Sequence, residues 1–311
     1  MKYYDLFCGI GGFHLGMQKA GHECIGSCEI DNDAREIYKK NYGNYPTESD
    51  STKIDPGKLK DFDVLCAGFP CQPFSLCGER KGFIDKRGNR FFDIVRIARE
   101  KKPKFLLMEN VKGLLYNDHG RTFSKILTTL SDMGYSTEWE CIDGSAFLAQ
   151  HRERVFIIAH YGKECTRPIF PLQKNRDKCA QTQIKQIKKS IDDSYRIYST
   201  DGIARTLRAT AGGMGAKTGL YAMAYVSNTN SNMKNRVQIR DKTWALTNSS
   251  NDFSILQGKR LRRLMPIECE RLMGFPDNFT EGVSETARYR LIGNAVMVPI
   301  IEELGKQIGR T

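Results

Sequence analysis

Four side chains in the first half of this 311-residue sequence could together carry out covalent catalysis. Cys71 follows a predicted strand, in the turn Gly68-Phe69-Pro70-Cys71-Gln72, and Glu109 closes the next predicted strand. Arg152 and Arg154 lead into a further apolar run. A thiolate is a strong nucleophile that neighbouring cations favour, and a carboxylic acid can deliver a proton. The set therefore predicts an enzyme in which Cys71 attacks the substrate.

A glycine-rich turn near the N-terminus predicts a cofactor site. The segment Cys8-Gly9-Ile10-Gly11-Gly12 directly follows an apolar strand and opens a helix. Glycine lets a ligand approach the backbone and permits positive φ. Glu29 ends the second predicted strand, where a carboxylate can accept hydrogen bonds from ribose hydroxyls. His14 stands where the dinucleotide fingerprint has its third glycine, which argues against a nicotinamide-dependent reductase.

Strand and helix signals alternate through the first half of the chain and position these residues. Strands are predicted at 3–7, 23–28, 62–67, 105–109 and 154–159, and helices at 13–20, 33–42, 91–101 and 122–133. Such a series predicts an α/β fold with a doubly wound, mostly parallel sheet. Cys71 and Glu109 then share the carboxyl edge of the sheet, where open α/β sheets bind their ligands.

The composition changes after about Cys165 and predicts a second, smaller and irregular domain. Residues 161–265 contain 20 basic and 7 acidic side chains, a balance that suits a polyanionic partner as well as a solvated basic surface. We assign 1–174 and 266–311 to a catalytic, cofactor-binding domain and 175–265 to target recognition. Helices are predicted at 266–273 and, after a Gly-Asn turn, at 295–308. The polar stretch 227–251 is either disordered or a long functional loop.

The ten cysteines and the short apolar runs exclude several protein classes. No CxxC pair and no Cys/His quartet at zinc spacing occurs, so we expect free thiols and no metal. Apolar runs are strand-sized, whereas a spanning helix needs about 20 apolar residues. The first residues enter a strand pattern directly, which leaves no room for a cleavable leader. We expect a cytoplasmic protein with no membrane association.

Five segments, in this order, resemble motifs of bacterial DNA (cytosine-5) methyltransferases of the restriction-modification type. They are Asp5 to Phe13, Gly68 to Gln72, Glu109 to Val111, Gln150 to Arg154, and Gly293 to Val296. The second region also contains a familiar stretch, Arg196 to Gly219. The resemblance implies a Rossmann-like domain that uses S-adenosylmethionine.

The resemblance also implies how the catalytic residues act. Cys71 would add to carbon 6 of a flipped-out cytosine, because carbon 5 alone is too weakly nucleophilic to take up a methyl group. Glu109 would bind the ring nitrogen N3 and the exocyclic amine, and Arg154 would hold the O2 oxygen. Arg152 would support the thiol and its loop. No base for removal of the carbon 5 proton is evident.

The cofactor pocket follows from the same motifs. Its residues would be Phe7, Gly9, Ile10, Gly11, Gly12, Glu29, Ile30, Asp50, Ser51, Gly68, Pro70, Asn294 and Ala295. Glu29 would bind the ribose, and Ile30 and Asp50 would surround the adenine. Two positions depart from the family pattern: Ile30 replaces an aromatic ring, and Arg90 replaces an apolar residue. We expect altered cofactor affinity from these departures.

Duplex DNA is the expected partner of the basic regions. Candidate contacts in the loop after the nucleophile are Ser75, Cys77, Arg80, Lys81 and Arg87, and in the second domain Arg196, Arg205, Arg208, Gly212 and Gly213. Arginine reads guanine, but most contacts of this kind go to phosphate and sugar. We expect a monomer, and a cognate restriction endonuclease acting at the same site is a further possible partner.

Two other functions remain open at this point. An RNA cytosine-5 methyltransferase would use the same fold, although the Cys-Phe-Thr element typical of enzymes acting on transfer RNA does not occur. A catalytically silent DNA-binding module is the other alternative. The intact set of Cys71, Glu109 and Arg154 argues against it.

Overall fold

The computed structural model describes residues 1–70, 90–162, 168–172 and 264–311, together with six short strands between Gln186 and Arg262. The chain divides into two compact units. One comprises Met1–Gly144, Glu153–Lys174 and Ala295–Thr311, and the other comprises Ser145–Arg152 and Asn175–Asn294.

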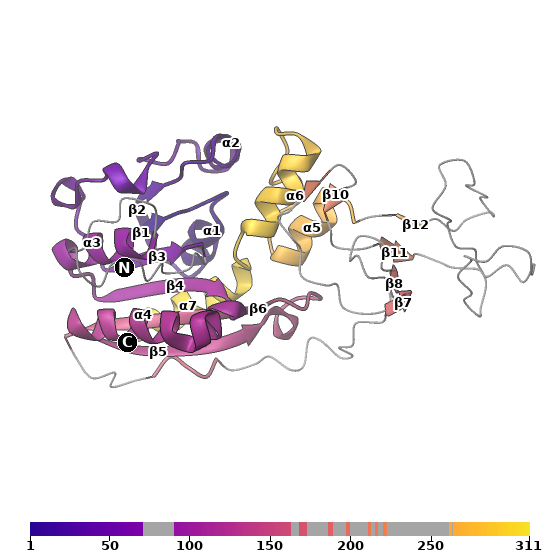
Figure 1. Ribbon diagram of the computed structural model, residues 1–311. Coiled ribbons are helices and arrows are strands. Elements are labelled where there is room, and N and C mark those ends of the chain that lie inside the picture. Colours follow the sequence, from indigo (N-terminus) through magenta and orange to yellow (C-terminus); the bar gives the residue numbers. More distant parts are fainter. Residues whose placement is uncertain are drawn as a thin grey trace, which may run out of the picture. The chain divides into compact units, whose positions relative to one another are not determined.

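A six-stranded sheet forms the centre of the first unit, with strand order β2-β1-β3-β4-β6-β5 (Figure 1). Its strands are β1 (Lys2–Leu6), β2 (Glu23–Cys28), β3 (Val64–Gly68), β4 (Phe105–Val111), β5 (Tyr135–Asp143) and β6 (Glu153–Tyr161). The first four pair in parallel, whereas β6 runs antiparallel to both β4 and β5. The predicted mostly parallel α/β fold is confirmed.

Four described helices connect successive strands: α1 (Gly12–Lys19), α2 (Asn32–Tyr42), α3 (Arg90–Lys101) and α4 (Arg121–Asp132). A further helix, α7 (Val298–Ile308), lies at the C-terminus. Short 3-10 turns add η1 (Ser51–Lys53), η2 (Pro56–Lys58), η3 (Lys112–Leu115), η4 (Asn117–Gly120) and η5 (Gly144–Ala146). Local signals set the ends of α2: the Asp31 side chain accepts a hydrogen bond from the amide of Ala34, and Gly43 closes the helix at φ 83°.

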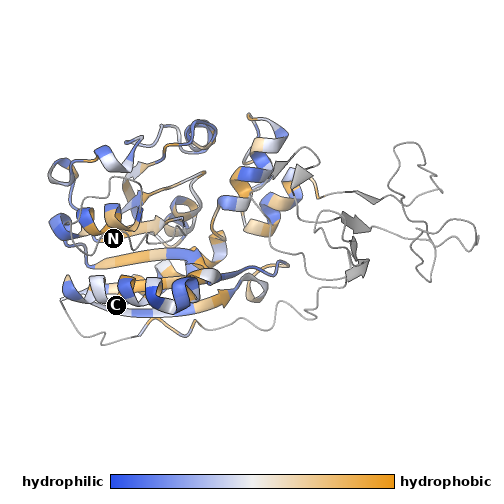
Figure 2. Cartoon of the chain, in the orientation of Figure 1, coloured by the Kyte–Doolittle hydropathy of each residue, from blue (hydrophilic) through white to orange (hydrophobic). Residues whose placement is uncertain are grey.

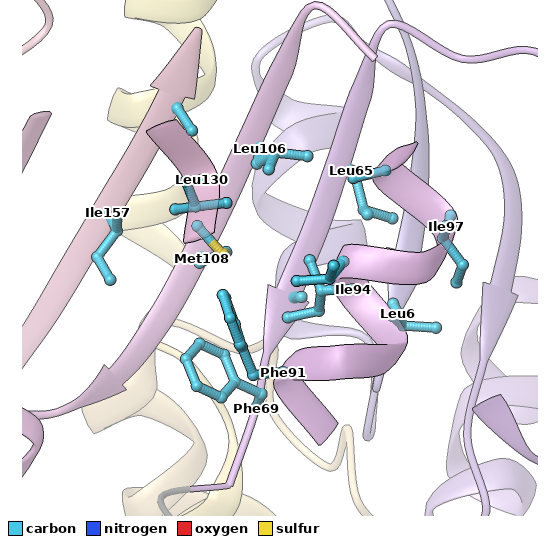
Figure 3. Packing of buried hydrophobic residues seen from close by; sticks show 14 of the residues in the cluster. Leu6, Leu65, Phe69, Phe91, Ile94, Ile97, Leu106, Met108, Leu130 and Ile157 are labelled. Carbon is cyan, nitrogen blue, oxygen red and sulfur yellow. The ribbon is translucent and has the colours of Figure 1, made fainter. Parts of the chain in front are cut away.

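One buried cluster of this unit lies between the sheet and helices α3 and α4. Further buried apolar side chains lie on α1 and α7. Figure 3 shows Leu65, Leu106 and Ile157 on the strands facing side chains such as Ile94 on α3 and Leu130 on α4. Each fully buried side chain of this size contributes roughly 1.5–3 kcal/mol. The central strand β4 is accordingly largely hydrophobic, whereas the helices carry polar outer faces (Figure 2).

Glycines let α1 and α7 pack closely. A Cβ on Gly16 would stand 2.6 Å from Cβ of Ile301, so only glycine permits this approach. The packing of Gly16 against Ile301 therefore holds α7 against α1, the helix that follows the glycine-rich turn.

The second unit contains two described helices, α5 (Pro266–Met273) and α6 (Glu285–Asn294). The short strands are β7 (Gln186–Lys188), β8 (Ile197–Ser199), β9 (Ala211–Gly212), β10 (Gly215–Ala216), β11 (Leu220–Ala222) and β12 (Leu261–Arg262). They form a four-stranded sheet of order β12-β11-β8-β7 and a β10-β9 pair.

Two elements differ from the sequence prediction. Strand β5 was not predicted, because it is an edge strand whose side chains are mostly half-buried and show no clean apolar alternation. The predicted turn at Gly293 and Asn294 is wrong: these residues end helix α6, and α7 begins at Val298. Within the described residues, no helix has the length and apolar character needed to cross a membrane.

Candidate active site

The ends of β3 and β4 bring the catalytic candidates together. Gly68, the last residue of β3, is in register with Glu109 on β4. A Cβ on Gly68 would stand 3.4 Å from the Phe13 ring and 3.7 Å from Oε2 of Glu109. The backbone then continues through Phe69 and the exposed Pro70 towards residue 71. The Glu109 carboxyl group therefore lies beside the strand end from which the predicted nucleophile follows.

Asn110 fixes the relative position of these two strand ends. Its buried side-chain amide donates a hydrogen bond to the carbonyl oxygen of Phe69 at 2.9 Å. Its side-chain oxygen accepts a hydrogen bond from the backbone amide of Val111, also at 2.9 Å. Phe69 precedes Cys71 by two residues in the sequence, so the Asn110 side chain fixes the last described part of the chain before the predicted nucleophile.

Glu109 and Arg154 form an ion pair at this edge. Nε of Arg154 lies 3.1 Å from Oε1 of Glu109, and the two side chains are only 16% and 11% exposed. Register explains the meeting, because Arg154 on β6 lies opposite Val111 on β4, two residues beyond Glu109 on the same face. Nη1 of Arg154 also donates to the carbonyl oxygen of Glu153 at 2.8 Å, which fixes the guanidinium. A carboxylate and a guanidinium held in this way can bind a planar group that has both donors and acceptors.

Arg152 has a different partner. It is 2% exposed, and its Nη2 donates a hydrogen bond to the carbonyl oxygen of Gly293 at 3.1 Å, within the second unit. The two arginines predicted for one site therefore have separate hydrogen-bond partners. The role predicted for Arg152, support of the thiol, stays a prediction.

The glycine-rich turn has an unusual backbone. Phe7, Gly9 and Gly11 have φ values of 65°, 54° and 90°. For a non-glycine residue such as Phe7 the left-handed region costs roughly 1–2 kcal/mol, and such outliers cluster at ligand sites. Gly12 is required for packing, because a Cβ there would stand 2.7 Å from the Val296 side chain. No described atom lies within 4 Å of the place where a Cβ on Gly9 would stand, so this point of the turn has room for a ligand.

Glu29 is oriented at the mouth of this turn. Its Oε2 accepts a hydrogen bond from the backbone amide of Gly9 at 2.8 Å, and its Oε1 accepts one from the amide of Asp31 at 2.7 Å. Nη1 of Arg35 donates to the Glu29 carbonyl oxygen at 2.9 Å. A carboxylate held so firmly is preorganised to accept hydrogen bonds from hydroxyl groups of a ligand.

Asp50 is the N-cap residue of the turn η1. Its Oδ1 accepts hydrogen bonds from the amide of Thr52 at 3.0 Å and from the Thr52 hydroxyl at 2.8 Å. These two hydrogen bonds hold the pKa of Asp50 below its usual range. Ser51 beside it is buried, whereas Ile30 is 61% exposed and has no aromatic ring to offer a ligand.

These features fit a nucleoside cofactor. Open space lies over Gly9, and Glu29 and Asp50 offer acceptors for a ribose and an exocyclic amine. Among the described residues no group of three or more His, Cys, Asp or Glu side chains could hold a metal ion.

Several residues around the turn were not found by sequence reasoning. Asp5 on β1 is fully buried, and burial together with the charge of Glu29 raises its pKa well above the usual range. The His14 ring stacks on Tyr42 at 3.8 Å between centroids. Only the spacing of Tyr38 and Tyr42, one turn apart on a helix facing the glycines, could have indicated this aromatic support.

Four cysteines near the turn, of which three are buried and Cys24 is half-buried, are poor nucleophiles. Burial raises the pKa of Cys24 to about 11 and that of Cys28 to about 12. The pKa values of Cys8 and Cys66 are raised for the same reason. These four thiols stay protonated at neutral pH and act as packing groups.

The remaining site predictions fall outside the described residues. They concern the nucleophile Cys71 and the DNA contacts Ser75, Cys77, Arg80, Lys81, Arg87, Arg196, Arg205, Arg208 and Gly213. For Gly212 the backbone alone is described, in β9, where it pairs with Gly215. Asn294 is exposed at the end of α6, and Ala295 is half-buried.

Relatives of known identity extend over the whole chain. The family model described as C-5 cytosine-specific DNA methylase matches residues 1–310. The type II methyltransferase M.HhaI of Haemophilus parahaemolyticus is 33% identical over 343 residues, covering 99% of this chain and 94% of the relative. The type II methyltransferase M.SsoII of Shigella sonnei is 37% identical over 319 residues, covering 99% of this chain and 79% of the relative.

Solved structures show the same fold. The Dnmt2 methyltransferase of S. pombe superposes with a TM-score of 0.69 at 19% sequence identity, covering 98% of this chain and 97% of that one. A putative DNA modification methyltransferase from an E. coli prophage superposes with a TM-score of 0.59 at 19% identity, covering 100% and 99%. At such identities the superpositions support the architecture alone.

Proposed function

Because this chain belongs to the C-5 cytosine-specific DNA methylase family, and so is a DNA (cytosine-5) methyltransferase, we propose that it modifies a flipped-out cytosine within one specific duplex sequence. The observation that carries the proposal is the ion pair of Glu109 and Arg154 at the strand edge that leads to Cys71. A reactive atom inside a stacked duplex is out of reach of these side chains, so the base must leave the stack.

The residues divide the chemistry between them. The Cys71 thiolate forms a bond to carbon 6 of the cytosine, which makes carbon 5 nucleophilic. The Glu109 carboxyl group binds the exocyclic amine and delivers a proton to N3, where charge accumulates. Arg154 donates a hydrogen bond to O2 and keeps Glu109 oriented. After carbon 5 has been methylated and has lost its proton, the bond to Cys71 breaks and the thiolate leaves.

The glycine-rich turn would hold S-adenosylmethionine, which when bound supplies an electrophilic methyl group. Glu29 would accept hydrogen bonds from the ribose, and Asp50 would accept one from the adenine amine. Phe7, Ile10 and Ile30 would provide apolar contacts, and Gly68, Pro70 and Ala295 would close the pocket. The room over Gly9 and the fixed carboxylate of Glu29 support this assignment.

Sequence recognition would belong to residues 175–265, with their excess of basic side chains. We propose that the protein acts as a cytoplasmic monomer whose methylation protects DNA from a cognate restriction endonuclease. Support comes from the relatives, which are named type II methyltransferases.

Incubation of the protein with labelled S-adenosylmethionine and either duplex DNA or transfer RNA tests this function. We expect label in DNA, and base-resolution mapping of DNA from expressing cells should place 5-methylcytosine at one recurring sequence. Label in transfer RNA alone would contradict the proposal. Cys71→Ser should abolish labelling and retain DNA binding, which separates catalysis from a purely DNA-binding role.

A further inference from the structure

Charged side chains of helix α3 form hydrogen bonds with Ser51 in the turn η1. The buried Ser51 hydroxyl donates a hydrogen bond to Oδ2 of Asp93 at 2.8 Å and accepts one from Nη1 of Arg90 at 3.3 Å. Nη1 of Arg90 also lies 3.4 Å from Oδ2 of Asp93. Nη2 of Arg96 donates to the Ser51 carbonyl oxygen at 2.6 Å and lies 3.7 Å from Oδ1 of Asp93. Three charged groups thus meet on a single serine.

These contacts between η1 and α3 determine the orientation of the Asp50 carboxylate. One carboxylate oxygen, Oδ1, is engaged by Thr52 in the same turn. The other, Oδ2, lies 3.8 Å from Nζ of Lys53, a side chain that is 81% exposed and therefore weakly held. Oδ2 is the oxygen that a ligand can use. Its direction depends on η1, and η1 depends on the contacts of Ser51.

The two arginines of this cluster are partly exposed, Arg90 at 27% and Arg96 at 37%, whereas Asp93 is 14% exposed. Arg90 differs from Arg96 because it donates to the Ser51 hydroxyl, the group that also contacts Asp93. Its charge is also near enough to favour the ionised form of Asp50. An arginine whose donors are already directed to Ser51 and Asp93 is rigid, because its planar group has fixed donor directions.

We propose that Arg90 is a positioning residue for the adenine of the cofactor: by holding Ser51 against Asp93 it directs Oδ2 of Asp50 at the exocyclic amine and so selects an amino-purine. This inference rests on the proposed use of Asp50 as the adenine acceptor. Arg90 itself touches no reacting atom.

The test measures base discrimination in the absence of DNA. Titration calorimetry would give dissociation constants for S-adenosylhomocysteine and for S-inosylhomocysteine, in which an oxygen replaces the exocyclic amine. Since a hydrogen bond to a charged group strengthens binding substantially, the wild-type protein should prefer the adenosyl compound by about tenfold or more. Arg90→Met should reduce this preference to about two- to threefold, and Arg90→Lys should restore part of it.

Controls separate positioning from folding. Arg99→Met, at an exposed position on the same helix, should leave the preference unchanged. Ser51→Ala removes a single hydroxyl and should reduce the preference for the adenosyl compound as Arg90→Met does. This variant provides an independent measurement if Arg90→Met folds poorly. In methylation assays, Arg90→Met should raise KM for the methyl donor and change kcat less than about twofold.

Equal weakening of both compounds by Arg90→Met, or an unchanged preference, would overturn the inference and leave the proposed function standing. A wild-type protein that binds neither S-adenosylmethionine nor S-adenosylhomocysteine and methylates no DNA would instead refute the proposed function.

Discussion

The hydroxyl group of Tyr42 donates a hydrogen bond to the carbonyl oxygen of Gly11 at 2.7 Å, and its ring fills the space that a side chain on Gly11 would need. A Cβ on Gly11 would stand 2.3 Å from a ring carbon of Tyr42. The His14 ring stacks on the Tyr42 ring, with 3.8 Å between centroids and an interplanar angle of 13°. The second helix of the fold thus shapes the turn at which the cofactor is expected.

Gly11→Ala should therefore weaken cofactor binding by more than about tenfold and lower the melting temperature. Two costs combine: a positive φ, which costs roughly 1–2 kcal/mol for an L-residue, and the overlap with Tyr42. Gly21→Ala is the matched control, since Gly21 has φ 87° and no described atom within 4 Å of its hypothetical Cβ. The melting temperature and the dissociation constant for the cofactor are measured for both variants. The difference between the two variants gives the effect of the steric overlap with Tyr42. Equal effects of the two substitutions would show that Tyr42 plays no part.

Arg154→Ala should lower the rate constant for methyl transfer to DNA by about 100-fold or more, the usual cost of removing one donor from a catalytic site. It removes the donor to the substrate and leaves the largely buried carboxylate of Glu109 without this ion pair. Single-turnover methylation at saturating DNA and cofactor measures the effect. Lys104→Ala is the control, because it breaks a pair with Asp63 whose lysine is 69% exposed. Full activity in Arg154→Ala would exclude the role assigned to the ion pair.

His14 should make the protein less stable in mild acid. Burial lowers the pKa of His14 to about 4, so below pH 6.5 the unfolded chain binds a proton that the folded protein does not. The free energy of unfolding should therefore fall as the pH drops from about 6.5 towards 4, by at most roughly 1.4 kcal/mol per pH unit from this group. His14→Phe keeps a ring on Tyr42 and should flatten the slope. Urea unfolding between pH 4.5 and 7.5 compares the two proteins, and parallel slopes would contradict the assignment.

Arg288→Met should destabilise the second unit strongly. Glu270 is fully buried on α5, and its Oε1 accepts hydrogen bonds from Nη2 of Arg288 at 2.9 Å and from the Thr280 hydroxyl. Removing one partner of a buried ion pair costs about 3–5 kcal/mol, whereas Glu270→Leu combined with Arg288→Met should recover most of the loss. Arg271→Ala breaks an exposed pair with Asp277 and should cost far less than Arg288→Met, because solvent screens exposed ion pairs. Denaturant unfolding gives all three values, and a small loss in Arg288→Met would disagree with this account.

The placement of Glu109 and Arg154 at one edge of the sheet could be predicted from local patterns. Glu109 and Arg154 each lie at the end of a strong apolar strand, and strand ends at one edge of a sheet meet regardless of packing details. The strand borders were displaced by only one or two residues for the same reason.

Long-range contacts were not predictable from local patterns. The stack of His14 on Tyr42, the buried acid Asp5 and the Arg90 cluster all join segments whose meeting depends on the complete fold. Helix α6 was overlooked because its polar sequence, with Arg288 paired to a buried partner, shows no clear apolar face. Buried ion pairs of this kind conceal helix periodicity, since a charged residue stands where an apolar one is expected.

The most direct test of the central claim is covalent capture of the enzyme by its target. A duplex that contains the recognised sequence with 5-fluorocytosine at the target position blocks loss of the carbon 5 substituent, so the bond to the enzyme should persist in the presence of S-adenosylmethionine. Mass spectrometry of the digested complex should then find the DNA attached to the sulfur of Cys71, with no attachment in Cys71→Ser. Absence of any attachment in the wild-type protein, or attachment through another residue, would contradict the account.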